Sequence, residues 1–319
     1  MKRKKIVCLG GGIGTVNLIK GLKQYKDLDI AVVVSMADEG GSSGRLRRLY
    51  NILPPGDLVS CMAALCDSNN KNVSQLLTYR LPGNRYAKDT ELAGHKIGNL
   101  IFVALRDLTG NFEKAIDQFQ SIFAIPGVFL PATEENVSIS AKTVEGKIVH
   151  GEETIDRGKY SGKRVLEEVY LHPVNARATK KVLTWLKEAD VIIAGPGDLY
   201  TTILPVLIIP DIAEQLKKST AKKIFIINVA NKPFETKGYE GMDYVHAIEK
   251  HLGIFPFNTV IMNNNYKIEI PKNFQYKYVQ MDSIGKNASI TLVPSDLVDE
   301  KFPLYHDSIK LANIVYKHI

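Results

Sequence analysis

The chain of 319 residues, 45% apolar and 24% charged, has the composition of a globular protein with room for one large domain or two medium ones. No window approaches the roughly 18 consecutive apolar residues of a membrane-spanning helix, so no membrane span is expected. The formal net charge of +7 permits an anionic partner, but the lysines are dispersed and form no basic stripe interleaved with aromatics, which argues against nucleic-acid binding.

The cysteines and the N-terminal segment predict a cytoplasmic location. Cys8, Cys61 and Cys66 are scattered and lie in apolar stretches, as free buried thiols do in a reducing compartment. The basic start MKRKK leads into a short apolar run that ends in glycines. That pattern is typical of a first buried strand and not of a secretory signal peptide.

The first half of the chain alternates strand-like and helix-like segments. Apolar, β-branched runs predict buried strands at 4–10 and 31–37, and an apolar stripe at helical spacing predicts a helix at 15–25. A helix is expected at 57–66, where prolines precede an aspartate able to cap it. Two further helices are expected at 95–108 and 111–123.

At the start of the second half of the chain, the spacing of apolar residues changes from helical to alternating. Segment 137–155 alternates apolar and polar residues about a Glu-Gly turn, which predicts an antiparallel β-hairpin. Strands are then expected at 191–197, 222–231, 259–265 and 289–297, and helices at 176–189, 242–253 and 306–318. This order predicts a single α/β domain over 1–319, with a doubly wound, mainly parallel Rossmann-like sheet and a small β-hairpin insertion.

Three glycine-containing turns follow predicted strands, at the sheet edge where parallel α/β sheets bind ligands. The first is GGGIGT (10–15), whose backbone N–H groups at a helix start suit a phosphate. Its spacing is neither the dinucleotide fingerprint G-x-G-x-x-G nor a P-loop, which disfavours an NAD-dependent oxidoreductase. A tight turn without a ligand is the alternative. The candidate residues are Gly10, Gly11, Gly12, Gly14 and Thr15.

The second turn is DEGGSSGRLR (38–47), which combines carboxylates, glycines, hydroxyls and guanidinium groups. Guanidinium groups are planar donors suited to phosphate. The candidate residues are Asp38, Gly40, Gly41, Ser42, Ser43, Arg45 and Arg47. A solvated loop with local salt bridges is the alternative.

The third turn is GPGDLYTTILP (195–205), with candidate residues Gly195, Gly197, Asp198, Tyr200 and Thr201. An aspartate that merely caps a helix is the alternative here. Two intervening motifs add candidates. Asp57 of LPPGDL lies near the same edge, and His95 and Asn99 of GHKIGNL are four residues apart, so on a helix they share one face.

In this order, GGGIGT, DEGGSSGRLR, LPPGDL, HKIGNL and GPGDLYTTILP resemble the CofD/YvcK family, and most closely its YvcK-type branch of gluconeogenesis factors. The similarity runs from about Lys4 through HDSIKLA, nearly the whole chain. The resemblance implies a Rossmann-like fold and a cytoplasmic, dimeric bacterial protein that binds UDP-sugars, typically UDP-N-acetylglucosamine. It also implies a link to gluconeogenic growth, cell shape and peptidoglycan precursor supply, with no reaction assigned.

Under this hypothesis the first and third glycine turns hold the diphosphate, and Arg45 and Arg47 neutralise its charge. Asn228 and Asn231, near the end of a predicted strand, would contact the uracil or the sugar hydroxyls. A simple turn at the strand end is the alternative for these two asparagines.

The other branch of the family provides the alternative function. CofD enzymes transfer a 2-phospholactate moiety from a nucleotide-linked donor to a deazaflavin, with magnesium. Asp38, Asp57 and Asp198 would then ligate Mg²⁺, which prefers carboxylate oxygens and substrate phosphates. His95 would act in proton transfer.

The chain departs from the YvcK pattern at four named positions, all on the expected nucleotide-sugar side. Glu39 replaces the second aspartate of Asp-Asp-Gly-Gly, and Asp198 replaces the serine of Gly-Pro-Gly-Ser. Phe234 replaces a glycine in NVANKPFET (228–236), where the family usually ends Met-Thr-Gln-Pro-Gly-Glu-Thr, and Tyr305 replaces an arginine before the late His-Asp.

Overall fold

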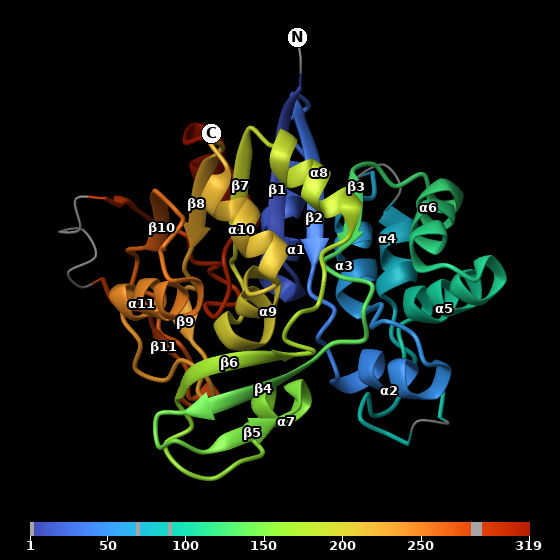
Figure 1. Cartoon of the computed structure of the whole chain (residues 1–319), viewed down its shortest axis with the longest axis horizontal. Coiled ribbons are helices and arrows are strands. Elements are labelled where there is room, and N and C mark those ends of the chain that lie inside the picture. Colours follow the sequence, from blue (N-terminus) through green and yellow to red (C-terminus); the bar gives the residue numbers. More distant parts are fainter. Residues whose placement is uncertain (1–2, 68–70, 89–90, 282–288) are drawn as a thin grey trace.

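The computed structural model describes residues 3–67, 71–88, 91–281 and 289–319, and its centre is a seven-stranded sheet (Figure 1). The strand order is β12-β10-β8-β7-β1-β2-β3, and every neighbouring pair is parallel. This confirms the predicted α/β fold. The strands are β1 (Lys4–Gly10), β2 (Leu28–Val34), β3 (Val128–Pro131), β7 (Val191–Ala194), β8 (Lys222–Ile226), β10 (Thr259–Asn263) and β12 (Thr291–Ser295).

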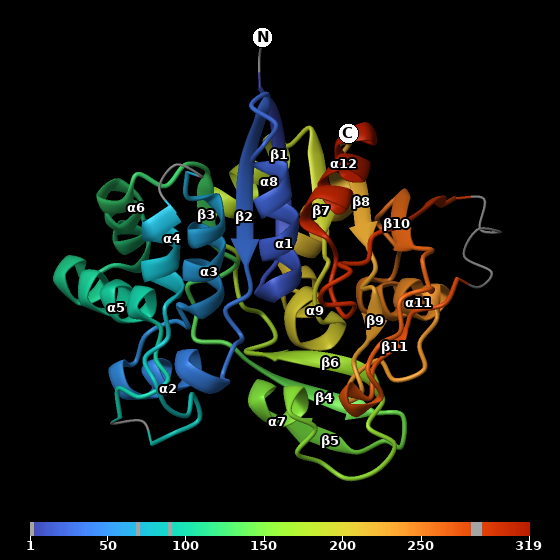
Figure 2. The same ribbon diagram turned by 180° about the vertical axis from the view of Figure 1, so that it is seen from behind.

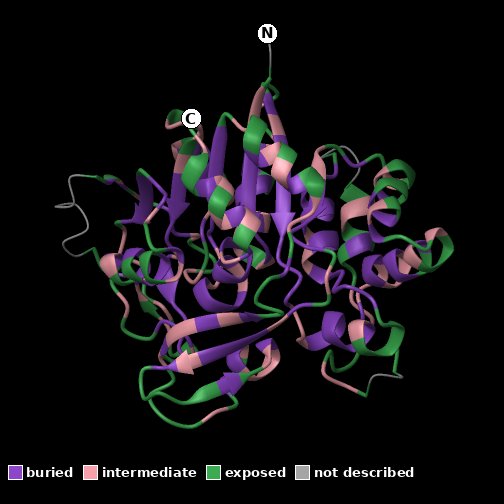
Figure 3. Ribbon diagram, viewed as in Figure 1, coloured by how far each residue is buried: buried purple, intermediate pink, exposed green. Residues whose placement is uncertain are grey.

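Helices cover both faces of this sheet. One face carries α1 (Gly12–Leu22), α3 (Gly56–Leu65) and α12 (Ser308–Lys317), and the other carries α8 (Lys180–Glu188) and α10 (Pro210–Lys218) (Figures 1 and 2). The central strands are therefore buried on both sides (Figure 3). This explains why they read as continuous apolar runs and not as alternating patterns.

Further helices lie at the two edges of the sheet (Figure 1). Beyond β3 lie α4 (Lys71–Thr78), α5 (Ile97–Thr109) and α6 (Phe112–Phe123), and beside β10 lies α11 (Gly241–Leu252). A π-helical turn (Leu199–Ile203) and α9 (Leu204–Leu207) follow β7, and a 3₁₀ turn spans Lys272–Phe274. Among the described residues no single helix is long and apolar enough to span a membrane, although one pair bent by 73° reaches that length together.

A second, antiparallel sheet lies below the carboxyl ends of the parallel strands (Figures 1 and 2). The predicted hairpin is present as β4 (Ser138–Thr143) and β5 (Ile148–His150). The prediction missed the third strand, β6 (Leu166–His172), and residues Glu152–Asp156 form helix α7 instead of continuing the hairpin. A two-stranded ladder of β9 (Ala230–Asn231) and β11 (Lys277–Tyr278) completes the strands.

The order of the large sheet reverses between β1 and β7. From β1 the chain builds β2 and β3 on one side, and from β7 it builds β8, β10 and β12 on the other. Connections therefore leave the carboxyl ends of β1 and β7 in opposite directions. Such a switch point is where doubly wound sheets bind ligands.

Candidate functional site

A cavity of about 330 Å³ opens at this switch point, and all three predicted glycine turns contribute to its wall. Small-molecule sites are of this size. The predicted residues that line it are Gly11, Gly12, Gly14, Asp38, Gly40, Gly41, Ser42, Ser43, Asp57, Asn99, Gly197, Asp198, Thr201 and Asn228. The turns that are far apart in the sequence therefore meet at one concave surface.

The first and third turns pack directly against each other. A Cβ atom at Gly14 would lie 2.3 Å from the carbonyl oxygen of Pro196, so only glycine fits there. The backbone N–H of Gly12 donates to Asp57 Oδ2 (2.7 Å), and that of Gly197 donates to Asn228 Oδ1 (2.9 Å). These contacts fix the turns before any ligand binds.

The N-terminus of α1 adds positive potential to this wall. The N-cap residue Gly11 has no side chain to cap the helix, Asp57 accepts from the N–H of Gly12, and Gly12 and Gly14 from the first turn line the cavity. The positive end of the helix dipole therefore faces the space where an anion would lie.

The second turn is a helix and not a loop. Residues Gly41–Tyr50 form α2, in which Ser42 and Ser43 are buried against the cavity. Gly44 permits this helix, because a Cβ atom there would lie 1.7 Å from the carbonyl oxygen of Glu39.

Arg45 does not line the cavity, contrary to the sequence prediction. Only 1% of it is exposed, and its guanidinium group donates to the carbonyl oxygens of Ala93 (2.7 Å) and Glu91. Its role in the fold is to hold the chain after α4 against α2.

Arg47 is also directed away from the cavity. Its guanidinium group donates to the carbonyl oxygens of Met36 and Asp38, both at 3.4 Å, and to the backbone of Val137. It thus joins α2 to the end of β2 and to the chain entering β4.

The cations that line the cavity are Arg80, Arg85 and Lys96, which the sequence reading missed. They come from the segment between α4 and α5, which follows no predicted strand, although Lys96 lies within the motif GHKIGNL between the candidates His95 and Asn99. Lys96 Nζ donates to Ser60 Oγ (2.7 Å). Burial lowers the pKa of Lys96 from its usual value, although the carboxylate of Asp57 acts in the opposite direction.

Asp38 and Asp57 form an acidic patch on the same wall. Burial, together with the charge of Asp57, raises the pKa of Asp38 to about 7. Burial also raises the pKa of Asp57, although Lys96 and the N–H of Gly12 oppose this. Near neutral pH the two carboxyl groups therefore carry less than two full negative charges.

His95 and Asn99 do not share a helix face, because α5 begins at Ile97 with Lys96 as its N-cap. His95 is buried, and its Nδ1 pairs with Ser42 Oγ at 2.8 Å, so it lies behind the cavity wall. Asn99 lines the cavity, and its buried Oδ1 has no partner among the described residues.

The remaining predicted residues support the wall from behind. Thr15 Oγ1 accepts a hydrogen bond from the N–H of Gly11 (2.9 Å), the Tyr200 hydroxyl pairs with Tyr239 (2.8 Å), and Asn231 Nδ2 donates to the Tyr239 carbonyl oxygen (2.7 Å). Gly10 and Gly195 likewise lie outside the lining, at the ends of β1 and β7.

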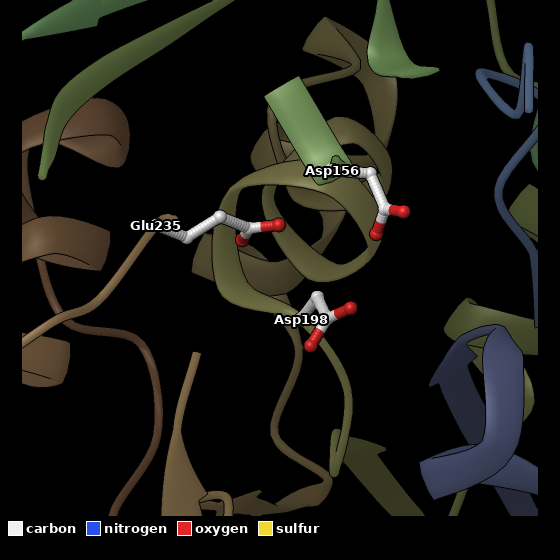
Figure 4. A group of neighbouring side chains, drawn as sticks. All are labelled: Asp156, Asp198 and Glu235. Atoms are coloured by element: carbon white, nitrogen blue, oxygen red, sulfur yellow. The ribbon is translucent and has the colours of Figure 1, made fainter. Parts of the chain in front are cut away.

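A group of three carboxylates, Asp156, Asp198 and Glu235, is shown in Figure 4, and the first two line the cavity. Atoms of Asp156, Asp198 and Glu235 come within 4.8 Å of one another, and Lys232 Nζ lies among them. Its distances are 2.5 Å to Asp198 and 3.1 Å to Glu235. Burial would lower the pKa of Lys232, but the three carboxylates outweigh it and hold the pKa well above its usual value. An ammonium group thus occupies the centre of this cluster.

This arrangement bears on the predicted magnesium ligands. The set of three close carboxylates found among the described residues includes Asp198 but neither Asp38 nor Asp57. Asp198 is committed to Lys232, so a cation at Asp38 and Asp57 would have to complete its coordination with Ser42, Ser43, Asn99, water or substrate phosphates.

The four departures from the family pattern divide into two pairs. Glu39 exchanges hydrogen bonds with Glu152 of α7, each accepting from the other's backbone N–H (3.1 and 3.2 Å), and Phe234 packs beneath the guanidinium of Arg164 (5.3 Å). Both attach the small sheet to the rest of the molecule. Asp198 and Tyr305, in contrast, line the cavity.

Comparison with known proteins gives a consistent result. The family model described as 2-phospho-L-lactate transferase CofD matches residues 6–298. The gluconeogenesis factor of Bacillus subtilis is 38% identical, with 98% of each chain covered, and a putative gluconeogenesis factor of Aquifex aeolicus is 36% identical, covering 99% of this chain and 97% of its own. A crystal structure of a UPF0052 family member from Bacillus halodurans superposes with a TM-score of 0.89 at 31% identity, covering 99% of both chains.

Proposed function

The chain belongs to the CofD family, and we propose that it is a regulatory factor whose switch-point cavity binds a UDP-sugar, with UDP-N-acetylglucosamine as the expected ligand. The curated relatives named gluconeogenesis factors support a role in growth on gluconeogenic carbon sources. The proposal includes the link to cell shape and cell-wall precursor supply, a cytoplasmic location and a homodimer.

The observation that carries this proposal is the convergence of the three turns on one cavity with mixed charge. The α1 N-terminus and the side chains of Arg80, Arg85 and Lys96 supply positive potential for a diphosphate. Backbone amides and charged donors of this kind bind phosphate oxygens without requiring a catalytic group.

A second candidate function is a magnesium-dependent transferase of the CofD type, supported by Asp38 and Asp57. Both carboxyl groups are half-buried in the cavity wall and have raised pKa values. Perturbed carboxyl groups of this kind are common at catalytic sites, and a divalent cation would offset their mutual repulsion. His95 lies behind Ser42 and would act in such a reaction only through that hydroxyl.

A thermal-shift panel separates the two functions. The ligands are UDP-N-acetylglucosamine, GDP, NAD and NADP, each with and without Mg²⁺. The regulator predicts stabilisation of several degrees by the UDP-sugar alone, because ligand binding to the native state raises the unfolding temperature. Turnover of a nucleotide-linked phospholactate would favour the transferase, and no response to the UDP-sugar would contradict the regulator.

A further inference from the structure

Two of the clustered carboxylates face the ligand space. Asp156 from α7 and Asp198 from the turn after β7 both line the cavity, and their side chains are 34% and 37% exposed. One comes from the small sheet's helix and the other from the main sheet, so this part of the wall forms where the two sheets meet (Figure 4).

Lys232 fixes the orientation of both groups. Its ammonium binds Asp156 Oδ1 and Asp198 Oδ2, while the other oxygen of each carboxylate has no hydrogen-bond partner among the described residues. Glu235 anchors the lysine from behind, because its carboxylate also accepts from Thr201 Oγ1 (2.7 Å) and the N–H of Tyr200 (3.2 Å). The two remaining oxygens are therefore held in place as acceptors.

An independent observation points to a ligand rich in hydrogen-bond donors. Asn99 is 1% exposed and lines the same cavity, and its Oδ1 has no partner among the described residues. Buried acceptors of this kind are normally satisfied by a donor. Two carboxylates of the cavity wall thus offer accessible oxygens to O–H or N–H groups, and the Asn99 amide oxygen in the same wall is buried and unpaired among the described residues.

We propose that Asp156 and Asp198, positioned by Lys232, select a diphosphate that carries a hydroxyl-rich sugar over the free nucleoside diphosphate. This inference rests on the proposed binding of a nucleotide in the cavity. Carboxylates accept hydrogen bonds from sugar hydroxyls, and they repel the additional charge of an unsubstituted terminal phosphate.

Asp198 and Lys232, which form one of the ion pairs of this cluster, are both departures from the family pattern. Asp198 stands at the usual serine, and Lys232 stands at the glutamine of the usual Met-Thr-Gln-Pro-Gly-Glu-Thr segment. Their ion pair at 2.5 Å shows that the two changes are complementary in charge. The double variant D198S/K232Q therefore removes one charge of each sign and restores the family residues at both positions.

The test is titration calorimetry of the full chain with UDP, UDP-glucose and UDP-N-acetylglucosamine. The quantity compared is the ratio of the affinity for each UDP-sugar to the affinity for UDP. We expect this ratio to fall roughly tenfold in D198S/K232Q and in Asp156→Asn, since a hydrogen bond to a charged group is lost. Glu214→Gln, which breaks an exposed ion pair with Lys218 on α10, is the matched control.

Single variants Asp198→Ser and Lys232→Gln complete a double-mutant cycle. A positioning role for Lys232 predicts that the two single effects on the ratio add to more than the double effect, because they act through one carboxylate. A purely structural role would lower the affinities for UDP and UDP-sugars alike and leave the ratio unchanged.

The outcomes separate this inference from the proposed function. An unchanged ratio in both D198S/K232Q and Asp156→Asn, with binding retained, would overturn the selection by the carboxylates and leave the proposed function standing. A wild-type chain that binds none of the three ligands would overturn both. If D198S/K232Q does not fold, Asp156→Asn gives the result, because Asp156 is at the rim of the cluster and one third exposed.

Discussion

Two groups of basic side chains lie near the cavity, and they differ in what they contact. Arg45 and Arg47 stand beside the glycines of the second turn, yet their guanidinium groups bind backbone carbonyl oxygens outside the cavity. Arg80, Arg85 and Lys96 come from the segment between α4 and α5, where only Lys96 falls within a motif, GHKIGNL, yet all three line the cavity. Proximity to a glycine motif in the sequence therefore does not by itself identify which cations line the cavity; the packing of the intervening helices does.

The first test of this comparison is the variant Arg45→Ala, for which we expect the largest change in free energy, a loss of folding stability. The variant removes the buried guanidinium donor of the Ala93 and Glu91 carbonyl oxygens and creates a void beside α2. We expect the free energy of unfolding to fall by about 3 kcal/mol. Urea denaturation measures this, with Arg177→Ala as the control, since Arg177 is 74% exposed in a surface ion pair. A loss below about 1 kcal/mol would show that Arg45 is not a structural residue.

The second prediction concerns the acidic patch beside the cavity cations. The pKa of Asp38 is raised from 3.8 to about 7, so between these pH values the native state keeps a proton that the unfolded chain releases. Stability therefore falls as pH rises through that window, by on the order of 2 kcal/mol, and Asp38→Asn should remove this part of the pH dependence. Urea denaturation at pH 5 and pH 8 compares the two proteins. Identical pH dependence would contradict the raised pKa.

The third prediction concerns the lining cations. Lys96→Met removes a half-buried ammonium from the cavity wall, and we expect UDP-sugar affinity to fall by about 2 kcal/mol, roughly thirtyfold. Calorimetry measures this, with Lys218→Met on α10 as the control because that lysine is 68% exposed. Undiminished affinity would place the diphosphate away from the segment between α4 and α5.

The smallest effect is expected for Arg47→Ala on ligand affinity. Because the guanidinium of Arg47 binds the chain before β4 and does not line the cavity, the affinity for UDP-sugars should change by less than about 0.5 kcal/mol. The same titration tests this. A loss as large as that of Lys96→Met would show that the two groups of cations do not differ as the contacts indicate.

The fold was predictable from the sequence because its central strands are buried on both faces. The segments around Val7, Val32 and Ile193 are continuous apolar runs followed by glycines, and they form β1, β2 and β7. The third strand of the small sheet was not predictable in the same way. β6 reads LEEVYLH, and its two glutamates break the apolar pattern of a strand.

The position of the cavity was predictable from the sequence, and its lining residues were predictable only in part. The three glycine turns follow predicted strands, and the carboxyl ends of parallel strands lie at one edge of the sheet. The topology of the sheet was therefore enough to predict that these turns come together there. The sequence could not show that Gly44 allows α2 to form, which directs the Arg45 side chain into the interior. Nor could it show that α5 begins only after Lys96, which leaves His95 outside the helix and Asn99 inside it. The sequence analysis missed Lys232 because two of its carboxylate partners, Asp156 and Asp198, lie more than thirty residues away in the chain.

The most direct test of the account is a crystal structure of the chain with UDP-N-acetylglucosamine. The account predicts the diphosphate at the switch point, against the turn at Gly11–Gly14 and beside Lys96, with the sugar toward Asp156 and Asp198. A ligand bound outside this cavity, or an empty cavity at a ligand concentration that saturates binding in solution, would contradict it.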